Sequence, residues 1–109
     1  RLILADAIGY AQRFKPRGII DIATLTGACA VTFGSEAIAM MGNDTELLGM
    51  LKKASDATYE RVWEMPLFEE YKDYVKSDIA DIKNTGGKTG SLMTSAWFLK
   101  EFAGNMPWV

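Results

Sequence analysis

The segment Gly18–Ala28 constrains the fold more than any other part of this chain, because an apolar, β-branched run passes through a Thr/Gly turn directly into a helical pattern. The run Ile19–Leu25 predicts a strand covered on both faces, with Asp21 as its polar exception. A strand that turns straight into a helix leaves main-chain N–H groups and small hydroxyls at the carboxyl edge of a sheet, where α/β proteins bind ligands. The turn Thr24–Gly27 is therefore the first candidate for a functional site.

The rest of the chain alternates between helical and extended patterns. We expect helices over residues 1–14, 26–32, 45–59 and 91–102, helical turns over 68–75, strands over 19–25, 36–41 and 78–82, and the start of a strand at 106–109. Residues 84–90 form a glycine-rich loop before the last helix. This alternation predicts the α/β class, as a three-layer α/β/α arrangement with a mixed, largely parallel sheet.

Composition excludes several classes of function. A chain of 109 residues with 49% apolar content forms one packed domain at most. The net charge of −2, with both signs interspersed, provides no basic surface for nucleic acid or an anionic membrane. No apolar run approaches the roughly 20 residues that cross a bilayer, and no signal peptide is visible, so we expect a cytoplasmic location. The single cysteine, Cys29, and the absence of histidine exclude an internal disulfide, a Ser-His-Asp triad and a His-ligated zinc site built from these residues alone.

Arg1 stands directly before the first predicted helix, which is an unfavourable position for a cation because the positive end of the helix dipole repels it. The placement makes sense if an anion lies between the guanidinium and the helix N–H groups, since together they clamp a carboxylate, a bicarbonate or a developing oxyanion. The alternative is that Arg1 is only the first residue of a trimmed piece of a longer chain. Position alone leaves both interpretations open.

The turn Thr24–Gly27 has a structural alternative, in which a threonine caps the helix and Gly27 lets helix and strand pack closely. The loop Asn84–Ser91 ends in Gly-Lys-Thr and invites a phosphate-binding interpretation, but the P-loop spacing requires glycine where this chain has Ile82. Asp78 and Asp81 are three residues apart, which does not put both on one face of a strand, so a turn role is favoured over a metal pair.

Three segments resemble the catalytic domain of the M17 leucyl aminopeptidases, which are two-metal exopeptidases. They are the opening Arg1–Ala7, the turn Thr24–Gly27, and the glycine-rich loop with the helical run Thr94–Leu99 that follows it. The segments occur in family order, and the resemblance covers essentially the whole chain. In that family the signature Asn-Thr-Asp-Ala-Glu-Gly runs directly into Arg-Leu, so Arg1 would be the residue just after it. We therefore expect residues 1–109 to be part of a catalytic domain, truncated at both ends.

The resemblance implies an activity and site residues. The activity is release of leucine and similar N-terminal residues from peptides, by a water that two divalent metal ions, zinc or manganese, activate. The residue matching Arg1 would help to hold a bicarbonate that acts as general base. Thr24 and Gly27 would shape the specificity pocket, and Leu25 would bind the peptide through its backbone. Family members are typically hexamers, which implies a homo-oligomer.

The chain departs from the family pattern in what it lacks. The metal ligands of the family, a lysine and four carboxylates, and its catalytic lysine precede the position of Arg1. We therefore expect the isolated chain to bind no metal pair and to have no peptidase activity. Some bacterial relatives bind DNA, but the near-neutral charge gives no support for that here. The alternative function is a small non-catalytic α/β module for assembly or nucleotide binding, in which nucleotide-induced stabilisation would depend on Lys88.

Overall fold

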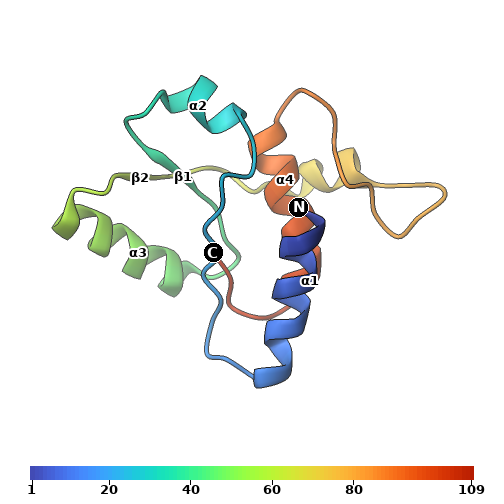
Figure 1. Cartoon of the computed structure of the whole chain (residues 1–109), viewed down its shortest axis with the longest axis horizontal. Coiled ribbons are helices and arrows are strands. Elements are labelled where there is room, and N and C mark those ends of the chain that lie inside the picture. Colours follow the sequence, from blue (N-terminus) through green and yellow to red (C-terminus); the bar gives the residue numbers. More distant parts are fainter.

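Helices and two short strands alternate along the chain in a computed structural model that describes residues 1–109 (Figure 1). The elements are α1 (Leu2–Ala11), the 3-10 helix η1 (Gln12–Phe14), α2 (Ala28–Phe33), β1 (Ile38–Met40), α3 (Thr45–Thr58), β2 (Val62–Glu64), the 3-10 helix η2 (Glu69–Val75) and α4 (Ser91–Ala103). The mixture of helices with a parallel strand pair is consistent with the predicted α/β class. No helix is both long and apolar enough to cross a membrane.

Helix α4 forms the centre of the molecule, with α1 and η2 packed against it (Figure 1). It begins after Gly90 and ends before Gly104, both of which have positive φ angles that glycine adopts without strain. Most of its side chains are buried, so it is enclosed by protein instead of lying on the surface. The larger core cluster consists of Ala5, Ile8, Ala96, Phe98, Leu99, Ala103 and Trp108.

A smaller core lies between α3 and the parallel pair β1–β2, where Met40, Leu48 and Val109 are buried. Helix α3 begins at the predicted cap, because the Asp44 carboxylate accepts a hydrogen bond of 2.8 Å from the main-chain N–H of Leu47. Such a cap contributes about 1 kcal/mol to helix stability. The leucines Leu47, Leu48 and Leu51 of α3 belong to or pack against this smaller core.

The predicted strand over residues 19–25 is wrong beyond its first residues. Only Ile19 makes a bridge, in parallel orientation to Trp108, and main-chain hydrogen bonds join residues 19–21 to residues 107–109. The pairing stops where the partner segment reaches Val109, and no other segment of residues 1–109 pairs with the rest of the run. Ile22 is therefore 88% exposed, instead of covered on both faces.

The predicted strand over residues 78–82 is also wrong, because this segment is a series of bends (Figure 1). The Ser77 hydroxyl accepts hydrogen bonds from the main-chain N–H groups of Ile79 and Ala80, which replaces strand pairing with a local turn. Ile79 points into solvent, with 98% of its surface exposed. Conversely, the strand β2 has no counterpart in the sequence prediction.

Candidate active site

Arg1 lies at the N-terminal end of α1, and its carbonyl oxygen accepts the first helical hydrogen bond, 2.9 Å from the N–H of Ala5. Its Nη1 donates a hydrogen bond of 2.7 Å to the main-chain carbonyl of Asn84. The side chain forms no ion pair with any residue of the chain. Since a guanidinium carries five N–H donors, most of them remain available to an anion.

The loop that Arg1 contacts is held tightly against α4. A Cβ on Gly86 would lie 2.8 Å from Cβ of Thr94 and 3.0 Å from Cβ of Tyr74, so only glycine fits there. Gly87 and Gly90 have φ angles of +96° and +60°, which glycine adopts without strain. Packing and turn geometry therefore account for the glycines of this loop, without a bound phosphate.

The turn Thr24–Gly27 is open to solvent on one side. Thr24 and Gly27 are exposed, whereas Leu25 packs against the larger core. Gly27 is the N-cap of α2 with no side-chain cap, and a Cβ added to it would meet nothing within 4 Å. The structural alternative, a threonine cap with a glycine required for close packing, is therefore wrong for this turn. Space remains beside Gly27 that a ligand can occupy.

Helix α4 contacts both α1 and α2, the helices that follow the two candidate segments (Figure 1). No hydrogen bond or ion pair links Arg1 to the turn Thr24–Gly27, because Arg1 bonds to the loop that precedes α4. The structure thus brings Arg1 together with residue Asn84, a pairing that the sequence did not predict, and leaves the turn as a separate surface.

Asp21 anchors the segment that leads into the turn, a role that the sequence did not predict. Its carboxylate accepts a hydrogen bond from Nε1 of Trp108, a residue that is 2% exposed. Burial raises the pKa of Asp21 above its usual 3.8, and the hydrogen bond from Trp108 counteracts this rise only in part. A carboxyl inside an otherwise apolar run was the one signal in the sequence that marked this residue.

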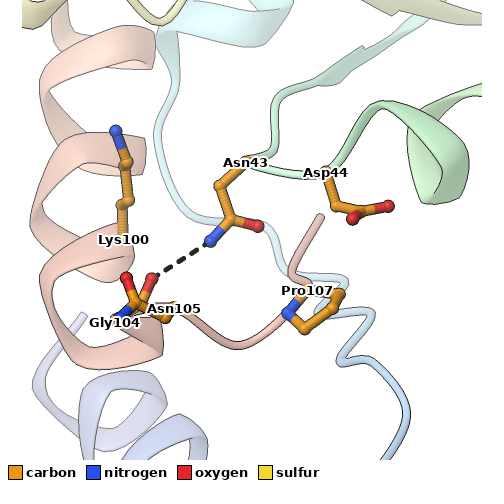
Figure 2. A pocket seen from close by; sticks show the side chains of 6 residues that line it. All are labelled: Asn43, Asp44, Lys100, Gly104, Asn105 and Pro107. Carbon is orange, nitrogen blue, oxygen red and sulfur yellow. Dashed lines mark hydrogen bonds between the residues drawn. The ribbon is translucent and has the colours of Figure 1, made fainter.

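A polar pocket of about 320 Å³ lies on another part of the surface, and Figure 2 shows its lining of Asn43, Asp44, Lys100, Gly104, Asn105 and Pro107. The amide of Asn43 donates hydrogen bonds to the carbonyls of Gly104, at 3.2 Å, and Met106, at 3.0 Å. Its Oδ1 accepts a hydrogen bond of 2.8 Å from the N–H of Trp108. The pocket lacks the apolar walls that an aliphatic side chain needs, and none of the predicted site residues lines it. Asn43 is better explained as a structural residue, because these hydrogen bonds hold the segment that follows α4, residues 104–108.

Comparison with known proteins decides the family. The model of the cytosol aminopeptidase family, catalytic domain (peptidase family M17), matches residues 1–109. The chain belongs to the cytosol aminopeptidase family. It is 56% identical over 108 residues to a probable cytosol aminopeptidase of Geobacter sp. (strain M21), and 54% identical over 108 residues to one of Geobacter sulfurreducens. A third relative, from Azotobacter vinelandii, is 47% identical over 108 residues. Each alignment covers 99% of this chain and 22% of the relative.

Membership in the cytosol aminopeptidase family confirms the family resemblance that the sequence indicated. The chain spans about a fifth of the length of these relatives. Within the chain, the Arg1 guanidinium has a single main-chain partner, and nothing lies within 4 Å of a Cβ built on Gly27.

Residues 1–109 do not fit a two-metal centre. They bring together no group of three or more His, Cys, Asp or Glu side chains, whereas a metal pair needs several such ligands. Asp78 and Asp81 are both exposed on the bends after η2. Cys29 is partly buried, and its Sγ lies 3.9 Å from the carbonyl oxygen of Ala37. The roles of Arg1, Thr24, Leu25 and Gly27 in an aminopeptidase site, and the lack of metal binding by the isolated chain, stay predictions.

Proposed function

We propose that the protein containing residues 1–109 is an aminopeptidase that releases leucine and similar N-terminal residues from peptides. The observation that carries this proposal is the match of the whole chain to the catalytic domain of the cytosol aminopeptidases, at about half identity to several relatives. The substrate is a peptide with a free N-terminus. In keeping with the names of its relatives, the proposal includes a cytoplasmic location.

Arg1 is the proposed catalytic residue, as a holder of a bicarbonate or a developing oxyanion. Two observations support this role. The Arg1 guanidinium has one main-chain partner and no ion pair. It also lies beside the N-terminal end of α1, where the helix dipole favours an anion. A bicarbonate held there would accept a proton from the attacking water, and the bidentate fork of the guanidinium would orient it.

Thr24, Leu25 and Gly27 are the proposed substrate-binding residues. The exposed side of the turn offers main-chain groups to the peptide, and the open space beside Gly27 leaves room for the first side chain. Leu25 packs into the core, which supports its action through the backbone.

Two divalent metal ions, manganese or zinc, belong to the proposed enzyme, and their ligands are proposed to lie outside residues 1–109, because these residues do not fit such a centre. The isolated chain is accordingly proposed to be inactive. The complete domain is proposed to have three α/β/α layers and to assemble as a homo-oligomer, a hexamer. The exposed β-branched side chains of Ile20 and Ile22 support further layers or subunits over the segment that contains them.

The test is hydrolysis of L-leucine p-nitroanilide by the full-length gene product that contains this sequence. We expect activity that needs manganese or zinc and that a chelator removes. Residues 1–109 alone, prepared beside a mock purification, should release no product. Absence of hydrolysis by the full-length protein with either metal would refute the proposed function, and activity of the isolated chain would refute the proposed location of the ligands.

A further inference from the structure

We propose that Asp21 is a positioning residue for the turn Thr24–Gly27, and that its hydrogen bond from Trp108 fixes the turn for binding of the N-terminal residue of a peptide. The inference rests on the proposed function, since it assigns to the turn a role in substrate binding. Asp21 itself need not touch the substrate.

The hydrogen bonds along the segment show why Asp21 is critical. The N–H of Ile19 donates to the carbonyl of Pro107 at 2.8 Å, and the N–H of Val109 donates to the carbonyl of Ile19 at 3.0 Å. The N–H of Asp21 donates to the carbonyl of Val109 at 2.9 Å. Residues 22–26 then form no hydrogen bond within the chain, until the carbonyl of Gly27 accepts the N–H of Val31 at 3.2 Å. Asp21 is therefore the last polar attachment before the turn.

Trp108 is a fixed point to which Asp21 is attached. Its ring belongs to the larger core, and its main chain is held on both sides by Asn43. The N–H of Trp108 donates to Oδ1 of Asn43 at 2.8 Å, and its carbonyl accepts the N–H of Asn43 at 3.0 Å. Because the indole ring is held in place, its N–H donates in one fixed direction. The Asp21 carboxylate therefore cannot shift without losing this hydrogen bond.

Loss of this attachment should act on substrate binding more than on the chemical step. The turn is three residues from Asp21 and is otherwise held by the packing of Leu25 and by α2. A looser turn spends less time in the geometry that accepts the first side chain of the peptide. KM should therefore rise while kcat changes little.

The experiment compares variants of the full-length protein. Asp21→Ala removes the acceptor, Asp21→Asn keeps a neutral one, and Trp108→Phe keeps the ring in the core while removing the donor. Asp44→Ala is the matched control, because it also removes one carboxylate hydrogen bond, of 2.8 Å to the N–H of Leu47, but at the start of α3. The readouts are amide hydrogen exchange at residue 21 and Val31, the hydrogen-bonded N–H groups on either side of the turn, by mass spectrometry, and kcat and KM with L-leucine p-nitroanilide.

We expect Asp21→Ala to speed exchange of the hydrogen-bonded N–H groups of residue 21 and Val31, which flank the turn, and to raise KM by about fivefold, the loss of roughly one hydrogen bond, with kcat within about twofold. Trp108→Phe should act in the same direction, Asp21→Asn should restore most of the wild-type behaviour, and Asp44→Ala should change neither readout. The inference is overturned if exchange at residue 21 and Val31 is unchanged in Asp21→Ala, or if Asp44→Ala raises KM equally. Failure of the proposed function is distinct, because it removes activity from the wild type while the exchange of residue 21 and Val31 still decides whether Asp21 positions the turn.

Discussion

The Nη1 of Arg1 donates a hydrogen bond of 2.7 Å to the main-chain carbonyl of Asn84, which joins the start of α1 to the loop that leads into α4. This contact fixes one side of the guanidinium and leaves its other donors free. The position of a proposed catalytic residue thus depends on a loop that is distant in the sequence.

Arg1→Lys should lower kcat of the full-length protein by at least about tenfold, because lysine keeps the charge but lacks the planar fork that holds an anion with two hydrogen bonds. Arg1→Ala should lower it further. The measurement is hydrolysis of L-leucine p-nitroanilide with and without added bicarbonate. Wild-type protein should respond to bicarbonate and Arg1→Ala should not. An Arg1→Lys variant with wild-type kcat would contradict the proposed role.

Gly86→Ala should destabilise the protein by about 1–3 kcal/mol, the range for overpacking a filled site. The new Cβ would lie 2.8 Å from Cβ of Thr94, so the loop or α4 must shift. The matched control is Gly49→Ala in the middle of α3, where a Cβ meets nothing and alanine favours the helix by roughly 0.5–1 kcal/mol. Melting temperatures should move in opposite directions. Equal shifts would show that the loop is not packed as described.

The pH dependence of stability should reveal the burial of Asp21. Because the pKa of this carboxyl is raised above 3.8, the folded state holds its proton to a higher pH than the unfolded state does. Asp21 therefore lowers the free energy of unfolding as pH rises from 3.8 through the raised pKa. The side chain in Asp21→Asn cannot ionise. The melting temperature of this variant minus that of wild type should therefore be higher at about pH 7 than at about pH 4.

The control for this comparison is Gly49→Ala, which changes no titratable group and should shift the melting temperature equally at both pH values. The burial of this carboxylate would be contradicted if the melting temperature of Asp21→Asn minus that of wild type were the same at both pH values, or lower near neutrality.

Helices were predictable from the sequence because their signals are local. The cap at Asp44 and the inward face of α4, with Leu92, Ala96 and Leu99, are as expected, since periodicity and capping act within a few residues. Strands depend on a partner elsewhere in the chain. The run at residues 19–25 has partners only up to Val109, and β2 forms because β1 lies beside it.

The candidate site shows the same contrast between local sequence signals and tertiary contacts. The turn Thr24–Gly27 was recognisable from residue types, whereas the bond from Arg1 to Asn84 and the bond from Trp108 to Asp21 arise only from packing on α4. Residue patterns mark groups that are suited to bind a ligand. Which groups meet is decided by tertiary contacts between segments that lie far apart in the sequence.

Gly27→Ala should separate a binding role of the turn from a structural one. A Cβ at Gly27 meets nothing within 4 Å, and the φ angle of −67° suits any residue, so stability should change by less than about 1 kcal/mol. If the space beside Gly27 accepts the first side chain of the peptide, the added methyl group narrows it. The ratio of kcat/KM for leucine over alanine p-nitroanilide should then fall by about tenfold or more.

Gly49→Ala again provides the control, because it adds the same methyl group on α3 and should leave the leucine to alanine ratio unchanged. An unchanged ratio in Gly27→Ala, with wild-type stability, would mean that the open space beside the turn does not receive the substrate side chain. A fall in the ratio with wild-type stability would support the pocket, because overpacking within the fold would also lower the melting temperature.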